Sequence, residues 1–368
     1  MIKCLVVLLL ICIHGNHAQQ YVNNTILESL QSISPVLYNA IHSSVSVPEI
    51  TDLLNQNITF FLPAEAALNA SITSGKLNFS SNAYSALQFL TLNGSHHANA
   101  FSASRKFYTT NSHNLMSIGP TLLPNYTIQA NRFEIYSGIT KATIVSQNIQ
   151  CSNGLIHMVD NFLQPASTPL ITISDLAELE YMEGLLKSLN VSDTVSGMNK
   201  TILAPTNEAW TAANGSTLPF GTLIHNLKYL VIDGSYTSDL FLSEEPVAYT
   251  SDYRNMPITI QLQQGKLLVN GAASIVKTDI MTTSGIIHII DTVLSADAIL
   301  ESTRSNASAT TPSSTSSNGG TNDDNSTTNK KMPPLDSSSM ASSLSYSNSV
   351  HCIYYYVLIC LISYICCL

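Results

Sequence analysis

Two stretches of this chain each occur twice, and this internal repeat constrains the fold more than any other feature. Residues 153–163 (NGLIHMVDNFL) recur as residues 284–294 (SGIIHIIDTVL), and residues 59–68 (TFFLPAEAAL) recur as residues 201–210 (TILAPTNEAW). The order is kept and the spacings are similar, so the chain carries two tandem copies of one unit. The about 280 residues between the chain's two ends suit two domains of ordinary size.

The second copy has the clearer pattern of helices and strands. Apolar residues at helical spacing predict a helix over 172–189, and a further helix is expected over 222–231. Thr206 is expected to cap a helix whose first turn holds Glu208. Asn270-Gly271 is a hairpin signal. Strands are expected in a short segment ending at Pro205 and over 258–262, 266–269, 273–276 and 286–293. Helices first and strands later indicate an α+β domain.

The N-terminal end resembles a secretory signal peptide. Lys3 precedes a short apolar run over 4–13, and small residues follow, so we expect cleavage after Ala18. The apolar run is shorter than the ~20 residues that a membrane-spanning helix needs. Residues 1–18 are therefore predicted to direct the chain into the secretory pathway.

The C-terminal end resembles a glycosylphosphatidylinositol (GPI) attachment signal. Residues 352–368 carry no charge, and a polar spacer separates them from the small residues Ala341, Ser342 and Ser343. We expect attachment at Ala341 and removal of residues 342–368, with 337–339 or Ser343 as other attachment points. A plain transmembrane tail is the alternative, although no Lys or Arg follows to hold it.

Residues 302–341 are rich in Ser and Thr and poor in apolar residues, so we expect a stalk without a core.

Cys151 is the only cysteine between the predicted signal peptide and the C-terminal tail. This excludes a disulfide scaffold and predicts a buried free thiol. The net charge of −9 and the absence of a Lys/Arg cluster exclude nucleic acid as a partner.

Sequons for N-glycosylation are dense, and each predicts a surface position in a secreted chain. They lie at Asn23, Asn57, Asn69, Asn78, Asn93, Asn125, Asn190, Asn199, Asn214, Asn306 and Asn325.

The repeated residues resemble the fasciclin domain family. Residues 201–210 resemble its first motif, 284–294 its second, 229–240 its central stretch and 270–280 its late hairpin. The first copy is degenerate, because Ala64 replaces the capping Thr206 and Ala66 replaces Glu208. Both copies also lack the family's central histidine, since Tyr229-Leu230 and Phe89-Leu90 occupy that place.

This resemblance covers residues 25–300 and implies a particular fold and role. Each domain is expected to be a wedge of mostly antiparallel strands with packed helices. The family implies extracellular adhesion, or association with matrix and cell wall, often by tandem pairs on a GPI anchor. The segment around Asp279 and Ile280 also resembles one that is associated with receptor binding in animal matrix members of the family, which implies an adhesion contact there. A turn residue at the end of a strand is the alternative interpretation of Asp279. The first copy has Asn148-Ile149 there.

Other polar residues are interpreted as structural. His157 and Asp160, like His288 and Asp291, lie three apart on an expected strand and so point to opposite faces. We therefore expect hydrogen-bonded core histidines. His96, His97 and His113 lack the spacing of a metal site. Glu244 and Glu245 are interpreted as solvated surface, and no hydrolase, Walker or Rossmann motif occurs.

The sequence thus predicts a signal peptide over 1–18, a degenerate fasciclin-like domain over 19–167, a second over 168–301, a stalk over 302–341 and a C-terminal tail. The expected function is non-enzymatic: cell-surface adhesion, or binding to a wall or matrix protein or glycan, with the membrane reached through the anchor. No catalytic, cofactor or metal residue is expected. A structural glycoprotein without a specific partner, and less so an extracellular enzyme, are the alternatives.

Overall fold

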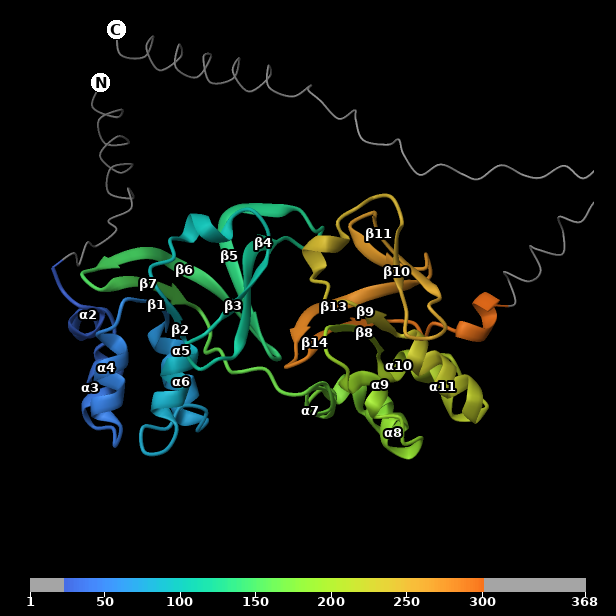
Figure 1. The fold of residues 1–368 in the computed structure, drawn as a ribbon, viewed down its shortest axis with the longest axis horizontal. Helices are drawn as coiled ribbons and strands as arrows, with labels where there is room; N and C mark the ends of the chain where they lie inside the picture. The colour runs from blue at the N-terminus through green and yellow to red at the C-terminus, as the bar shows by residue number, and fades with distance from the viewer. Residues whose placement is uncertain (1–22, 301–368) are drawn as a thin grey trace, which may run out of the picture. The chain divides into compact units, whose positions relative to one another are not determined.

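The computed structural model describes residues 23–300, which lie within one compact unit and form two domains of the same construction (Figure 1). The predicted signal peptide, stalk, GPI signal and the sequons at Asn306 and Asn325 lie outside the described residues. No helix within 23–300 is long and apolar enough to cross a membrane.

The first domain is built on a seven-stranded sheet in the order β2-β1-β7-β6-β5-β4-β3. Only β1 and β7 run parallel, and the remaining neighbours are antiparallel. The strands are β1 (Ile58–Pro63), β2 (Thr91–Asn93), β3 (Lys106–Thr109), β4 (Leu115–Leu122), β5 (Ile128–Ser137), β6 (Thr140–Cys151) and β7 (Gly154–Val159).

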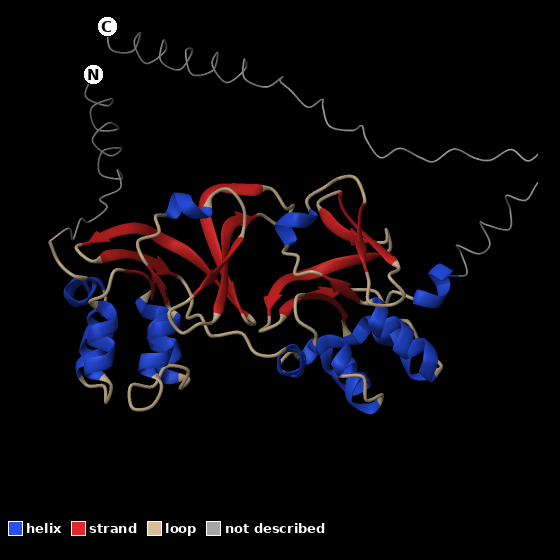
Figure 2. Ribbon diagram, viewed as in Figure 1, coloured by secondary structure: helices blue, strands red, loops and turns tan. Residues whose placement is uncertain are grey.

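The helices of this domain precede or interrupt the early strands, and α2, α5 and α6 contact β7, β1 and β2 (Figure 2). They are α2 (Ile26–Ile33), α3 (Pro35–His42), α4 (Val47–Leu54), α5 (Glu65–Thr73), α6 (Ala83–Phe89) and the 3-10 turn η1 (Ala98–Phe101). Cys151 is buried against Ser29 of α2, and burial raises the pKa of its thiol. The predicted buried free thiol is confirmed.

The second domain repeats this plan with the strand order β10-β11-β12-β13-β14-β8-β9, in which only β8 and β14 are parallel. The predicted wedge of mostly antiparallel strands is confirmed. The strands are β8 (Lys200–Pro205), β9 (Val231–Asp233), β10 (Val247–Thr250), β11 (Pro257–Gln263), β12 (Lys266–Val269), β13 (Ala273–Met281) and β14 (Gly285–Ile290).

The helices of the second domain are α7 (Pro169–Ser174), η2 (Ala177–Leu179), α8 (Glu180–Ser188), α9 (Asp193–Ser196), α10 (Asn207–Ala212), η3 (Gly215–Thr217), α11 (Phe220–Tyr229) and η4 (Ser238–Phe241). Of the two helices whose bounds were predicted in this domain, the one expected over 222–231 is found as α11, two residues earlier, and the longer one is divided. The single helix predicted over 172–189 is wrong, because Leu176 is extended. The side chain of Asn207 bridges this break: it donates to Ala177 O at 2.7 Å and accepts from Tyr181 N at 2.8 Å.

Local signals were more accurate at element ends. Thr206 caps α10 by accepting from Ala209 N at 3.2 Å, whereas Ala64 gives α5 no side-chain cap. Asn270 and Gly271 both adopt positive φ, as the predicted hairpin requires. The strand predicted over 273–276 extends to Met281 instead. Register shifts between Ile275 and Ile280 interrupt the alternation by which a strand is recognised.

The repeated glycines mark the closest approach of the parallel strands. A Cβ atom on Gly154 would lie 1.9 Å from Ile58 O, and one on Gly285 would lie 2.0 Å from Lys200 O. No side chain fits at these distances, so glycine at the start of β7 and β14 is required by the pairing with β1 and β8.

Candidate functional site

The two domains meet along a seam formed by the β5–β6 turn of the first and by β13 and η4 of the second. Gly138 O accepts a hydrogen bond from Met281 N at 3.1 Å, and Ser167 O accepts one from Thr283 N at 2.9 Å. These backbone contacts bring side chains from both domains together, and none of these pairs is close in sequence.

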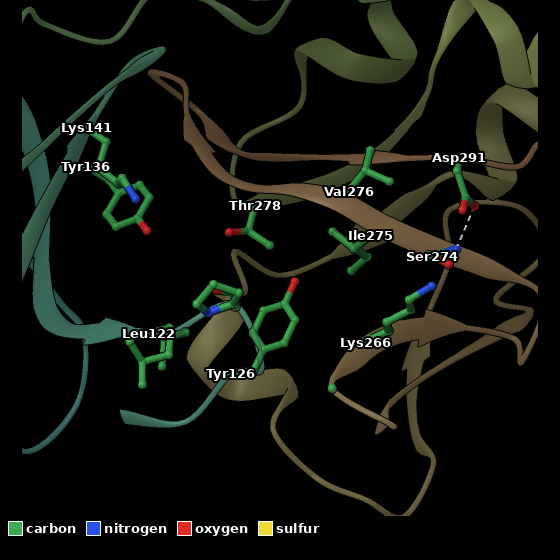
Figure 3. A pocket seen from close by; sticks show the side chains of 14 residues that line it. Leu122, Tyr126, Tyr136, Lys141, Lys266, Ser274, Ile275, Val276, Thr278 and Asp291 are labelled. Carbon is green, nitrogen blue, oxygen red and sulfur yellow. Dashed lines mark hydrogen bonds between the residues drawn. The ribbon is translucent and has the colours of Figure 1, made fainter. Parts of the chain in front are cut away.

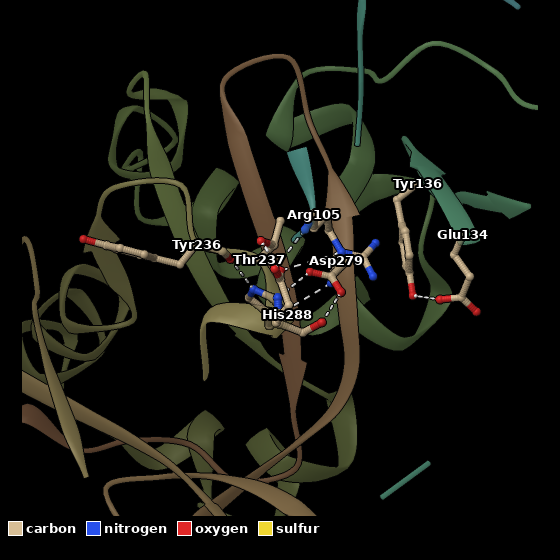
Figure 4. A network of polar contacts seen from close by, with 9 residues as sticks. Arg105, Glu134, Tyr136, Tyr236, Thr237, Asp279 and His288 are labelled. Atoms are coloured by element: carbon tan, nitrogen blue, oxygen red, sulfur yellow. Dashed lines mark hydrogen bonds and ion pairs between the residues drawn. The ribbon is translucent and has the colours of Figure 1, made fainter. Parts of the chain in front are cut away.

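Arg105 is the central charged residue of the seam. Its side chain is fully buried, its backbone N–H donates to Asp239 Oδ2 at 3.1 Å, and its Nε lies 3.7 Å from Asp239 Oδ1. Its guanidinium carbon lies 4.0 Å from the centroid of the Tyr136 ring (Figure 4). Among the described residues, no hydrogen-bond acceptor meets the three guanidinium nitrogens. The buried cation is therefore held by charge attraction and by the aromatic face.

Tyr136 links the seam to a second buried charge. Its hydroxyl donates to Glu134 Oε2 at 2.8 Å, and Lys141 Nζ donates to Glu134 Oε1 at 3.0 Å. Burial raises the pKa of Tyr136 far above its usual value, so the hydroxyl stays a donor at any physiological pH. Neither this residue nor Arg105 was singled out by sequence reasoning, because an isolated Arg or Tyr carries no local signal.

Asp279 lies inside the second domain instead of on its surface. It is 2% exposed and sits at a bulge of β13 with φ 62°. Its carboxylate accepts from Ser238 N at 2.8 Å and from the Ser238 hydroxyl (Figure 4). Ile280 is also buried, at 3% exposure. An adhesion contact through Asp279 and Ile280 stays a prediction, and it would require both side chains to leave the interior.

Asn148 plays the same part in the first domain. It has φ 60° at the equivalent bulge of β6, and its side-chain oxygen accepts from Ala98 N at 2.8 Å. Both residues thus tie a left-handed bulge to the start of a 3-10 turn, η1 or η4. An amide or a carboxylate serves this purpose, which explains the Asn-for-Asp difference between the copies.

The two repeated histidines are hydrogen-bonded core residues, as predicted. His157 accepts from Asn148 N at 3.3 Å and contacts His96 O at 2.9 Å, while His288 makes the same contacts with Asp279 N and Tyr236 O. Burial lowers the pKa of His157 to about 4 and also lowers the pKa of His288. Both rings are therefore neutral at pH 7.

The expectation that each histidine shares its strand with the aspartate three residues later is wrong, because β7 ends at Val159 and β14 ends at Ile290. Asp160 accepts from Thr143 N at 2.7 Å, and Asp291 accepts from Ser274 N at 2.7 Å. His96 contacts Asn93 O at 2.9 Å. Within residues 23–300 no group of three His, Cys, Asp or Glu side chains is arranged to hold a metal ion.

A cleft of about 430 Å³ opens beside the seam and is lined by both domains (Figure 3). The first domain contributes Tyr126, Tyr136 and Lys141, and the second contributes Lys266, Ser274 and Asp291. Tyr126 has φ 62° and packs against the core of the second domain. Lys266 is exposed and has no ion pair among the described residues. The partly exposed Tyr126 ring, the free ammonium of Lys266 and the carboxylate of Asp291 are together suited to binding a polar ring.

The sequon asparagines within the described residues are all exposed. They are Asn23, Asn57, Asn69, Asn78, Asn93, Asn125, Asn190, Asn199 and Asn214. These positions are accessible to a glycan, while modification itself stays a prediction.

Comparison with known proteins identifies the repeated unit. The sequence-family model of the fasciclin domain matches residues 37–165 and 173–296. Human periostin is 27% identical over 172 residues, which cover 43% of this chain and 19% of periostin. The rabbit transforming growth factor-beta-induced protein ig-h3 is 26% identical over 188 residues, covering 46% of this chain and 26% of that protein. The chain thus spans only a small part of these two relatives.

One further relative and one solved structure are covered more fully. The fasciclin-like arabinogalactan protein of Arthroderma benhamiae is 23% identical over 273 residues, covering 67% of this chain and 61% of that protein. A solved FAS1 domain pair from the insect cell adhesion molecule Fasciclin I has 16% identity and a TM-score of 0.35, and covers 73% of this chain and 98% of that chain. Because the family model matches two adjoining segments that fill most of the described residues, this chain belongs to the fasciclin family and carries two fasciclin domains in tandem.

Proposed function

We propose that this chain is a non-enzymatic cell-surface glycoprotein that mediates adhesion or binds a component of the cell wall or matrix. The cleft lined by both domains is the single observation that carries the proposal, because it offers a binding site that neither domain forms alone. The proposal is also supported by membership of the fasciclin family.

A glycan is the partner class that best fits the chemistry of the cleft. The ring of Tyr126 suits the apolar face of a sugar ring, and Lys266 and Asp291 offer a donor and an acceptor for hydroxyl groups. Asp279 acts indirectly, since it holds Ser238, which lines the same cleft as Thr278. We propose Asp279 as a positioning residue.

The remaining parts of the proposal concern how the protein is displayed. Residues 1–18 direct secretion, the sequons are glycosylated, residues 302–341 form a stalk and a GPI anchor is attached at Ala341. These proposals rest on sequence patterns. Release of the protein from cells by a phosphatidylinositol-specific phospholipase tests the anchor. A protein that resists release and keeps a C-terminal epitope carries a transmembrane tail instead.

Binding is tested with cells that display the full chain, incubated with labelled wall and matrix polysaccharides and with each other. We expect saturable binding that Lys266→Ala weakens severalfold. Lys187→Ala is the matched control, because Lys187 is exposed on α8 and does not line the cleft. Multivalent display strengthens modest affinity, so the soluble head should bind less tightly than the cells do.

Two results would contradict the proposal. Absence of saturable binding to any surface would leave a structural surface glycoprotein without a specific partner. Equal binding by the Lys266→Ala and Lys187→Ala variants would place the binding site away from the cleft.

A third variant, Asn125→Gln, removes the glycan expected next to the cleft residue Tyr126. Its binding should equal that of the unsubstituted chain, or exceed it because the cleft becomes more open.

A further inference from the structure

A second groove lies at the boundary between the two domains. In contrast to the polar cleft, its walls carry large apolar side chains. It has a volume of about 360 Å³ and is lined by Phe107 and Leu115 of the first domain and by Met198, Met281 and Ile286 of the second. Phe107 is 44% exposed, Leu115 is 43% exposed and Met198 is 74% exposed. Contiguous apolar exposure of this kind indicates a surface that something covers.

Asn199 forms part of the wall of this groove and is the acceptor of a sequon. It is exposed and has φ 55°. Its side-chain oxygen accepts from Ser235 N at 3.0 Å, while its Nδ2 has no hydrogen-bond partner within residues 23–300. The Nδ2 atom is the one to which an N-linked glycan is attached. The fold therefore fixes the side chain and leaves the reactive nitrogen free.

The third residue of this sequon is fixed by the fold as well. Thr201 is fully buried, its hydroxyl donates to Gly234 O at 2.7 Å, and it accepts from Tyr236 N at 2.9 Å. Thr201 therefore has two roles. It completes the N-glycosylation sequon, and it holds the backbone that follows β9 against β8.

The first domain provides a natural comparison. Its sequon at Asn57 occupies the equivalent place: Thr59 is fully buried, donates to Gly94 O at 2.8 Å and accepts from His96 N at 2.7 Å. The side-chain oxygen of Asn57 is also held, by Ser95 Oγ at 3.0 Å. However, Asn57 does not line the apolar groove. The two sites share their backbone setting and differ in what lies beside them.

We infer that the N-linked glycan on Asn199 is the occupant of this groove and covers Phe107, Leu115 and Met198. N-acetylglucosamine rings have apolar faces that pack on such side chains and polar edges that remain in water. Because the groove's walls come from both domains, the attached glycan bridges them. A second protein chain is disfavoured as occupant, because a glycan on the groove wall would block its approach. The inference rests on the secretion and glycosylation that form part of the proposed function.

The test compares Asn199→Gln with Asn57→Gln in the full chain, produced by a secretory host that attaches N-glycans. Peptide mapping by mass spectrometry first measures the occupancy of each sequon. The rate of Met198 oxidation by dilute hydrogen peroxide then reports whether the groove is covered. Met182, which is fully buried and does not line the groove, serves as the internal reference. Substituting the asparagines leaves Thr201 and Thr59 in place, so the hydrogen bonds of both threonines are kept.

We expect Asn199 to be occupied and Met198 to oxidise severalfold faster in Asn199→Gln than in the unsubstituted chain or in Asn57→Gln. Binding of an apolar fluorescent dye should rise in the same variant. Adding Phe107→Ser and Leu115→Ser to Asn199→Gln should remove the extra dye binding, which ties the signal to the groove.

Several outcomes would overturn the inference. An empty Asn199 in a chain whose other sequons are occupied would do so while leaving the proposed function intact. Equal Met198 oxidation in the two single variants would also reject it, as would a dimer of the fully glycosylated chain cross-linked through a photoreactive amino acid in place of Phe107. If every sequon is empty, the proposed cell-surface display fails, and the inference fails with it.

Discussion

Arg105 of the first domain and Asp239 of the second are joined twice, through a backbone hydrogen bond of 3.1 Å and a side-chain ion pair of 3.7 Å. Both side chains are excluded from water almost completely. A buried ion pair is weak as a source of net stability, but removing one member leaves an uncompensated charge. This relationship makes the seam sensitive to single substitutions.

We expect Asp239→Ala to lower the free energy of unfolding by about 3 kcal/mol, because Arg105 then keeps a buried charge without its partner. Urea denaturation of the full chain measures the change. Glu183→Ala is the control, since it breaks an exposed ion pair with Lys187 and should change stability by less than about 1 kcal/mol. Adding Arg105→Met should recover part of the loss. Equal effects of the two single substitutions would show that the seam does not depend on this pair.

The residue at the β13 bulge should tolerate an amide and not an aliphatic side chain. Asp279→Asn keeps an oxygen for Ser238 N and reproduces the first domain, where Asn148 accepts from Ala98 N. Asp279→Ala removes that acceptor and places alanine at φ 62°, so we expect a loss of about 2 kcal/mol or more. Thermal unfolding distinguishes the two variants. If Asp279→Asn abolishes partner binding without loss of stability, Asp279 is a direct contact after all.

Stability should fall in mildly acidic solution because of the buried histidines. The pKa of His157 is lowered from 6.5 to about 4, so between these values the unfolded chain binds a proton that the folded chain does not. Stability contributed by this ring is complete above pH 6.5 and falls as the pH drops toward 4, by up to about 3 kcal/mol. The groups facing the ring are Phe61, Phe101, His96 and His97, none of which is acidic.

The measurement is the free energy of unfolding at intervals between pH 7 and pH 4 for the unsubstituted chain and for His157→Gln. The difference between the two curves should shrink as the pH falls, since glutamine does not titrate. Parallel curves would mean that His157 has an ordinary pKa. His288 remains in both proteins, so its own contribution cancels in the comparison.

Glycine at the start of β14 should be irreplaceable. In Gly285→Ala the new methyl group would meet Lys200 O at 2.0 Å, so β8 and β14 must separate, and we expect a loss of about 3 kcal/mol or failure to fold. Gly184→Ala is the matched control, because it lies in α8 with open space around it and should stabilise the helix by up to about 1 kcal/mol. Denaturant midpoints of the two variants should move in opposite directions. A shift in the same direction would contradict the close approach of the strands.

Much of each domain was predictable from local sequence. The duplicated segments predicted the tandem domains, Thr206 and Asn270-Gly271 marked a helix start and a hairpin, and the apolar residues on both sides of His157 and His288 predicted core histidines. Periodicity failed where a tertiary contact replaced local hydrogen bonds. Asn207 supports the broken helix at Leu176, and the bulge at Asp279 hides the length of β13.

The sequence by itself determined that two similar α+β units exist, because the spacing of apolar residues and the choice of turn residues act over a few positions. Only the tertiary structure decided which surfaces those units share. Arg105 and Asp239 are 134 positions apart in the sequence, and their contact depends on how the two folded domains pack against each other. The polar cleft and the groove beside Asn199 arise from the same packing. No local pattern specifies such contacts, because each depends on the shapes of both domains at once.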